Sequence, residues 1–308
     1  MAPKEAAEAR VAPSRAARKV KVGLVQMSTT DDKRANVDKA ARGIVEARAG
    51  GADIVCLQEL FASPYFCQTE DAAAFELAEP LDGPTVTAIA AVARAEKVTV
   101  MTSIFERRAA GVYHNTLVVL GPEGERLGVY RKMHIPDDPQ YLEKFYFTPG
   151  DLGFQSIKTP RLEVGPLVCW DQWYPEAARL TALRGAEVLF YPTAIGWLPE
   201  EKAEHGVAQR DAWQTIQRAH AIANGVFVVA VNRVGQEGDP EKGIEFWGHS
   251  FVCDPFGRVI AQAGAGEEVL VAECDLSLLE ETRQIWPFLR DRRIDAYVGL
   301  DKRWLGDR

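Results

Sequence analysis

Apolar residues along this chain follow two alternating periods. Short apolar runs bounded by polar or turn-forming residues predict buried strands, and longer stretches with helical spacing of apolar positions predict amphipathic helices. The expected strands are 20–27, 53–57, 98–105, 115–120, 126–132, 164–169, 188–191, 226–232, 248–253, 258–263 and 269–275, and the expected helices are 33–49, 84–96, 175–184 and 207–224. Strands alternate with helices early in the chain, and hairpin turns at 121–124 and 254–257 connect strands later. The pattern predicts an α/β protein.

The first residues differ in composition from the rest of the chain. Residues 1–19 are rich in Ala and Arg and lack the apolar run of a secretory signal, and Glu5 and Glu8 are unusual in organelle-targeting peptides. We therefore expect a disordered N-terminal tail over 1–19. Because no repeat and no Pro/Gly/Ser-rich linker follows, we expect one domain over 20–308, with an extended C-terminal segment.

Composition narrows the functional classes. Apolar residues make up 47% and charged residues 26% of the 308 residues, which is typical of a globular protein with a large core. The net charge of −8 argues against nucleic acid as a partner, because phosphate binding needs clustered Lys and Arg. No apolar stretch is long enough to predict a membrane span. The five scattered cysteines form neither a disulfide framework nor a metal-ligand pattern, which predicts reduced thiols, a cytoplasmic location and no metal.

Three reactive side chains stand at the ends of predicted strands. Cys169 ends an apolar run and is followed by WDQWYPEAAR, Glu59 ends IVCLQE, and Lys132 ends RLGVYRK. Each has a simple structural explanation: a small buried thiol, a loop carboxylate and an exposed lysine. However, strand ends are where functional groups converge in α/β sheets, so the three side chains could form one site.

Such a site has a definite chemistry. A carboxylate can take the thiol proton, the resulting thiolate can attack an electrophilic carbon, and an ammonium group can stabilise the oxyanion that develops. The backbone N–H of Trp170 is a candidate second donor to that oxyanion. The residues alone therefore favour a thiol-dependent hydrolase, with Cys169 as nucleophile, Glu59 as base and Lys132 as oxyanion donor.

These same segments resemble the nitrilase superfamily of carbon–nitrogen hydrolases over most of residues 20–300. CLQELF, YRKMHIP and CWDQWYPEAAR correspond to its Glu, Lys and Cys motifs. The resemblance implies a four-layer αββα sandwich, pairing of subunits through helix faces into homodimers or larger homo-oligomers, and no cofactor. It also implies a second glutamate near the Lys and Cys, which falls on Glu143 in YLEKFYF.

Longer matches point to one branch of the superfamily. RKMHIPDDPQYLEKFYFTPGDLGF, VCWDQWYPEAAR, FYPTAIG and WPFLRDRRIDAY are similar to N-carbamoylputrescine amidohydrolases, which implies a small cationic N-carbamoyl amine as substrate. Candidates for the pocket that holds this substrate are Tyr65, His134, Trp170, Asp171, Thr193, Ala194 and Trp197. A carboxylate or an aromatic face is also expected near the distal amine, and Asp137, Asp138 and Glu200 are further candidates for that contact.

Two alternatives remain open at this stage. An amidase or a β-ureidopropionase-like enzyme would use the same chemistry on another substrate, and Arg233 could then bind a substrate carboxylate. A nitrile substrate fits the longer motifs less well. A non-catalytic assembly or sensing module of the same fold would need no complete set of Glu59, Lys132 and Cys169.

Overall fold

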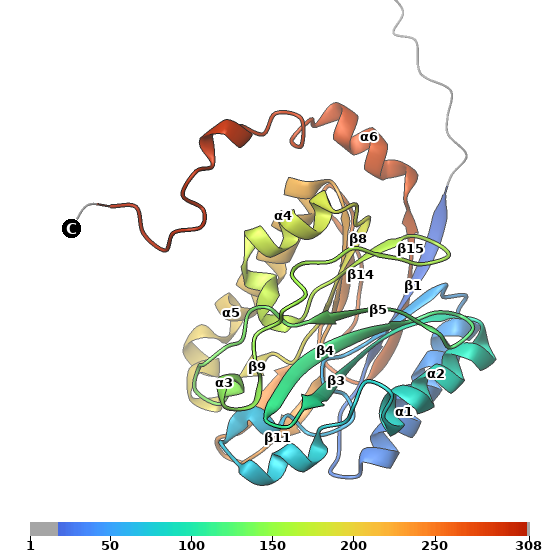
Figure 1. Cartoon of the computed structure of the whole chain (residues 1–308), viewed down its shortest axis with the longest axis vertical. Helices are drawn as coiled ribbons and strands as arrows, with labels where there is room; N and C mark the ends of the chain where they lie inside the picture. Colours follow the sequence, from blue (N-terminus) through green and yellow to red (C-terminus); the bar gives the residue numbers. More distant parts are fainter. Residues whose placement is uncertain (1–17, 307–308) are drawn as a thin grey trace, which may run out of the picture.

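Two six-stranded mixed sheets form the centre of the protein in the computed structural model, which describes residues 18–306 (Figure 1). In the first sheet β1, β2 and β3 run parallel, and β15, β4 and β5 pair antiparallel at its sides. Its strands, in spatial order, are β15 (Glu268–Asp275), β1 (Lys19–Gln26), β2 (Ile54–Leu57), β3 (Thr99–Ala109), β4 (Val112–Leu120) and β5 (Arg126–Arg131).

The second sheet has a similar organisation. Its strands, in spatial order, are β14 (Val259–Gln262), β13 (Phe251–Cys253), β10 (Phe227–Val231), β8 (Val188–Pro192), β7 (Glu163–Pro166) and β6 (Ile157–Lys158). The central strands β10, β8 and β7 are parallel, and the outer ones pair antiparallel. Parallel and antiparallel pairs thus occur together, as the combination of strand–helix alternation and hairpin turns predicts, whereas their central and edge positions were not predicted.

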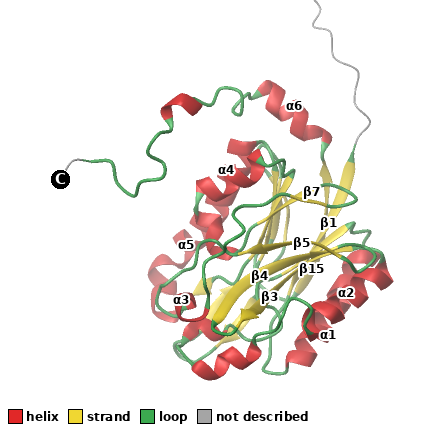
Figure 2. Ribbon diagram, viewed as in Figure 1, coloured by secondary structure: helices red, strands yellow, loops and turns green. Residues whose placement is uncertain are grey.

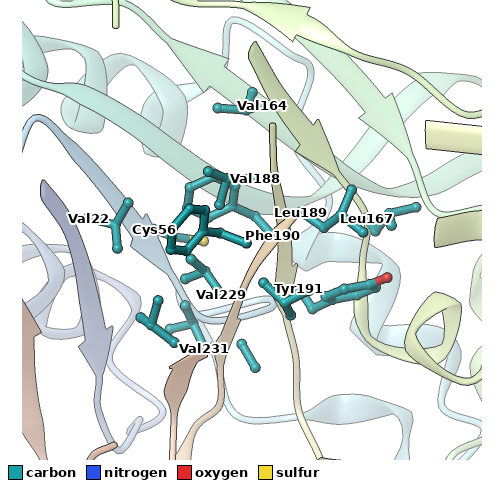
Figure 3. Packing of buried hydrophobic residues seen from close by; sticks show 14 of the residues in the cluster. Val22, Cys56, Val164, Leu167, Val188, Leu189, Phe190, Tyr191, Val229 and Val231 are labelled. Atoms are coloured by element: carbon teal, nitrogen blue, oxygen red, sulfur yellow. The ribbon is translucent and has the colours of Figure 1, made fainter. Parts of the chain in front are cut away.

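The two sheets pack face to face through alternate side chains of their strands. Figure 3 shows Val22 and Cys56 of the first sheet meeting Val188, Phe190 and Val229 of the second. The intervening residues of the first sheet point to its other face, because successive side chains of a strand alternate. Those residues pack against α1 (Lys33–Ala49) and α2 (Pro84–Glu96).

Two further helices, α4 (Pro175–Leu183) and α5 (Pro199–Asn224), cover the outer face of the second sheet (Figure 2). Both helices begin with proline, whose missing N–H costs nothing in the first turn. The layers are therefore helix, sheet, sheet, helix, and the αββα prediction is confirmed.

Several boundaries differ from the sequence prediction. The helix expected at 207–224 begins at Pro199, because Glu200 and Glu201 in the first turn complement its dipole and extend it toward the sheet edge. The strand expected at 164–169 ends at Pro166, and Cys169 begins the short 3₁₀ helix η3 (Cys169–Trp173) instead. A proline in the strand and a left-handed backbone at Cys169 end the ladder early.

Some elements have no counterpart in the sequence prediction. A small third sheet contains β9 (Gly196–Trp197), β11 (Val234–Glu237) and β12 (Ile244–Trp247). The short helices are α3 (Glu143–Tyr146), α6 (Ser277–Ile285), η1 (Phe66–Gln68), η2 (Ala72–Leu77) and η4 (Ile294–Ala296). After α6 the chain extends away from the sandwich (Figure 1), and its apolar side chains Ile294, Val298, Leu300, Trp304 and Leu305 are exposed. The predicted tail lies almost wholly outside the described residues, since 1–17 are not described.

Candidate active site

Glu59, Lys132 and Glu143 form a buried cluster at the ends of the strands of the first sheet. Lys132 directly follows β5, and its Nζ lies 2.9 Å from Glu59 Oε1 and 2.7 Å from Glu143 Oε2. The three side chains are fully buried. One ammonium between two carboxylates gives the cluster one excess negative charge when all three are ionised.

Glu59 is oriented by its neighbours. It follows β2, and the next residue, Leu60, has a left-handed backbone with a φ of 47°, which turns the chain sharply after the carboxylate. Asn115 Nδ2 donates to Glu59 Oε1 at 2.6 Å, and Ser103 Oγ donates to Asn115 Oδ1 at 3.3 Å. Among residues 18–306, Glu59 Oε2 has no hydrogen-bond partner and is the oxygen left to exchange a proton.

Glu143 is held from the opposite side. It lies in the first turn of α3, and Tyr65 Oη donates to its Oε1 at 2.6 Å. Burial raises the pKa of Glu143 to about 7, although the charge of Lys132 acts in the opposite direction. Burial alone would lower the pKa of Lys132, but the charges of Glu143 and Glu59 raise it well above its usual value. Lys132 is therefore a permanent cation in this site.

Cys169 stands at the start of η3 in a left-handed conformation with a φ of 41°. Its thiol is nearly buried and lies 3.9 Å from the carbonyl oxygen of Ala194. Burial raises the pKa of the Cys169 thiol, the charge of Glu59 raises it further, and Lys132 opposes both. The thiol is therefore protonated at neutral pH, and nucleophilic attack requires a base that takes its proton.

The loop that carries Cys169 is fixed by Asp171, which sequence analysis placed in the substrate pocket. Asp171 is fully buried, and its two oxygens accept hydrogen bonds from the backbone N–H of Val168, the hydroxyl of Tyr130, and the backbone N–H of His134. The His134 ring lies 2.7 Å from the same carboxylate and stacks on Tyr174. Asp171 and His134 are therefore engaged with each other and with this loop.

A cavity of about 470 Å³ opens above Cys169. Most of its wall is apolar or aromatic, as is common for small-molecule sites. The wall residues are Pro136, Asp138, Pro139, Tyr141, Cys169, Trp170, Trp173, Ala194, Ile195, Gly196, Leu198, Glu201, Gln209, Ala212 and Trp247. Two of them, Asp138 and Glu201, are acidic, and Lys, Arg and His are absent from this set.

The predicted pocket residues divide into two groups. Trp170, Ala194 and Asp138 line the cavity as expected. The others have different positions. Thr193 is fully buried, and the hydroxyl of Tyr65 is bonded to Glu143. Trp197 packs on Trp247, and its Nε1 donates to Gly206 O. Asp137 and Glu200 are exposed. Tyr65, Thr193 and Trp197 are thus not part of this cavity wall.

Sequence reasoning missed Tyr141, Glu201 and Trp247. Tyr141 Oη accepts from the backbone N–H of Gly196 at 3.1 Å and thereby holds the loop after Ala194. Glu201 enters the wall only because α5 begins at Pro199, and the single proline followed by two acids in LPEE could have located that start. For Trp247 the alternating IEFW pattern indicates a strand, but nothing in it indicates which cavity that strand borders.

No helix within residues 18–306 is long and apolar enough to cross a bilayer. Over the same residues, no three His, Cys, Asp or Glu side chains gather as metal ligands would.

The sandwich and the site together define a class of protein. The family model described as carbon–nitrogen hydrolase matches residues 21–284, and the chain belongs to this family, the nitrilase superfamily. A crystal structure of a carbon–nitrogen hydrolase from Helicobacter pylori G27 matches with a TM-score of 0.91 and 48% identity, over 93% of this chain and 100% of that one.

Two relatives are similar over almost their full length. An N-carbamoylputrescine amidase from Oryza sativa subsp. japonica is 44% identical over 92% of this chain and 94% of its own. A citrullinase from Francisella tularensis is 39% identical over 92% of this chain and 99% of its own. The protein is thus a carbon–nitrogen hydrolase, and its relatives act on more than one substrate.

Proposed function

We propose that this enzyme hydrolyses N-carbamoylputrescine to putrescine, carbon dioxide and ammonia. The proposed cysteine chemistry is supported by a nearly buried thiol, Cys169, whose pKa is influenced by Glu59, Lys132 and Glu143. The choice of N-carbamoylputrescine as substrate is supported by the acidic side chains of the cavity wall and by the name of the relative from Oryza sativa. No cofactor takes part, because a covalent cysteine intermediate divides the reaction into two easier steps.

In the first step Glu59 removes the proton of Cys169, and the sulfur adds to the ureido carbonyl carbon. Lys132 and the backbone N–H of Trp170 stabilise the tetrahedral oxyanion. When the intermediate collapses, the C–N bond to putrescine breaks and Glu59 returns its proton to the leaving amine. The product on the enzyme is an S-carbamoyl cysteine. Glu143 keeps Lys132 in place, 2.7 Å from its own Oε2.

In the second step a water molecule attacks the S-carbamoyl carbon. Glu59 takes one proton of the water and passes it to the departing sulfur, so the thiol is restored. The released carbamic acid decomposes to carbon dioxide and ammonia. The unpartnered Glu59 Oε2 is the oxygen that carries both protons, because Oε1 is engaged by Lys132 and Asn115.

The observation that carries the choice of substrate is the charge of the cavity wall. Asp138 and Glu201 lie on it, and the wall formed by the described residues contains no basic side chain. A distal ammonium would gain a charge-assisted contact there, whereas a substrate carboxylate would meet like charges. Arg233, the candidate carboxylate ligand of the alternative, is fully buried and paired with Glu237, outside this wall.

A matched pair of substrates tests the proposal. Citrulline, the compound after which the relative from Francisella is named, has the same ureido group, a comparable chain and an ammonium, but it also carries a carboxylate. We expect ammonia release from N-carbamoylputrescine with a kcat/KM at least tenfold above those for citrulline, N-carbamoyl-β-alanine and an ω-amide. Cys169→Ala is the blank. A preference for citrulline would contradict the proposed substrate and indicate a citrulline-hydrolysing enzyme. Failure of a thiol probe to label Cys169 selectively would favour a non-catalytic module of the same fold.

Variants of the wall sharpen the same test. A lost charged contact is worth about 1.5–3 kcal/mol, so Glu201→Gln should raise KM for N-carbamoylputrescine by roughly 10–100-fold. Its neighbour Glu200 is exposed and lies outside the wall, so Glu200→Gln is the control and should leave KM unchanged. Equal effects of both substitutions would show that the distal amine binds elsewhere.

A further inference from the structure

Arg233 is a completely buried cation away from the cavity wall. It lies directly before β11, and its Nη1 lies 2.8 Å from both carboxylate oxygens of Glu237. Its guanidinium also packs over the ring of Phe246, at 5.2 Å from the centroid. A buried ion pair of this kind adds little net stability, and apolar residues of similar size often replace such pairs without loss. Its contacts therefore require another explanation.

The second terminal nitrogen of Arg233, Nη2, donates within one segment of the chain, residues 59–63. Nη2 donates to the backbone carbonyl oxygens of Glu59 and Leu60, at 2.9 Å each. These carbonyls flank the left-handed residue that turns the chain after the proposed base. A left-handed leucine is strained and persists only where its surroundings fix it. The guanidinium holds its carbonyl side, and Ser103 Oγ accepts from its backbone N–H.

Glu237, the partner of Arg233, is connected through Tyr65 to Glu143. Glu237 Oε2 accepts from the backbone N–H of Tyr65 at 2.6 Å, and the hydroxyl of Tyr65 donates to Glu143 Oε1. The ion pair thus holds a segment that begins at Glu59 and ends at Tyr65. One end of this segment is Glu59 itself, and the other end, Tyr65, is bonded to Glu143, so the segment contacts or contains both carboxylates that flank Lys132.

We propose that Arg233 and Glu237 are positioning residues, which set the distance of Glu59 and Glu143 from Lys132 and so the orientation of the base toward Cys169. This proposal rests on the proposed function, because it assigns the ion pair to the alignment of that reaction. Lysine is not an equivalent replacement for Arg233, because the guanidinium donates from separate nitrogens in a rigid plane, whereas an ammonium donates from a single nitrogen.

The experiment compares Arg233→Lys with Arg48→Lys in the full-length protein. Arg48 is a matched control, because it also donates to two backbone carbonyls, of Ala52 and Glu96, at the end of β2 opposite to Glu59. We measure kcat and KM for N-carbamoylputrescine, the rate of Cys169 alkylation by iodoacetamide, and the melting temperature. A displacement of about 1 Å in a catalytic group can cost on the order of 10² in rate.

We expect Arg233→Lys to lower kcat on the order of 10²-fold with KM within about twofold, and to slow alkylation of Cys169. The alkylation rate distinguishes a positioning role of Arg233 from a role in packing alone. Loosened packing would expose the thiol and accelerate its labelling, whereas a misplaced base would slow it. Arg48→Lys should change only the melting temperature. If Arg233→Lys does not fold, Glu237→Gln, which retains an acceptor oxygen, is judged by the same two readouts.

Two results would overturn the inference. If Arg233→Lys matches Arg48→Lys in kcat and alkylation, or if its alkylation becomes faster, the pair has no positioning role. A wild-type protein that neither hydrolyses N-carbamoylputrescine nor labels at Cys169 would instead refute the proposed function and this proposal with it. The wild-type measurement therefore separates the two failures.

Discussion

Replacement of Lys132 by methionine is the perturbation for which the structure gives the largest effect on both stability and activity. Lys132 is fully buried between Glu59 and Glu143. Without the ammonium, two carboxylates share a buried space with no cation between them. Removal of one member of a buried ion pair costs about 3–5 kcal/mol, a large part of the 5–15 kcal/mol that typically stabilises a folded protein.

A control with the same contact distance isolates the effect of burial. Lys97 Nζ lies 2.7 Å from Glu123 Oε2, the distance that separates Lys132 Nζ from Glu143 Oε2, but both side chains of the Lys97 pair are more than half exposed. An exposed pair contributes about 0–1 kcal/mol. Denaturant unfolding at pH 7 should therefore show Lys132→Met destabilised by several kcal/mol and Lys97→Met nearly unchanged.

The loss in Lys132→Met should also depend on pH. Burial already raises the pKa of Glu143, and without the opposing charge of Lys132 this carboxyl should bind a proton still more readily, so the loss should be smaller at pH 5 than at pH 8. Turnover should fall by at least 10²–10³, the usual effect of one oxyanion donor. Wild-type stability at pH 7 combined with turnover within tenfold of wild type would refute this account of the cluster.

Three other outcomes follow from the structure. Cys169→Ser should unfold at the wild-type temperature but release almost no ammonia, and wild-type turnover would exclude the thiol as nucleophile. Burial raises the pKa of Glu143 in the folded state to about 7. The protonated side chain therefore stabilises the fold fully at a pH below the pKa of Glu143 in the unfolded chain, and this stabilisation is lost as the pH rises to about 7. Glu143→Gln should abolish that loss, as measured by unfolding at several pH values. The exposed apolar side chains after α6 predict a homo-oligomer, so sedimentation should show monomers only after removal of residues 286–308, and a monomeric full-length chain would contradict this.

The sequence by itself determined the class of fold and located the reactive residues. Strand and helix periods predicted nearly every element of the two sheets, because burial on one face imposes a local pattern that the chain itself displays. Charged or reactive side chains at the ends of apolar runs marked Glu59, Lys132 and Cys169. The structure brings the first two to within 2.9 Å and places Cys169 where their charges act on its thiol.

Only the tertiary structure decided what each neighbouring residue does. Asp171 and Tyr65 have side chains suited to bind a substrate, but the hydrogen bonds that occupy them come from residues distant in sequence, such as Tyr130 and Glu143. Likewise, the sequence offered Arg233 as a candidate ligand for a substrate carboxylate, whereas in the structure it is a buried partner of Glu237. A polar side chain binds whatever the fold places beside it, and that depends on long-range packing, which no local period encodes.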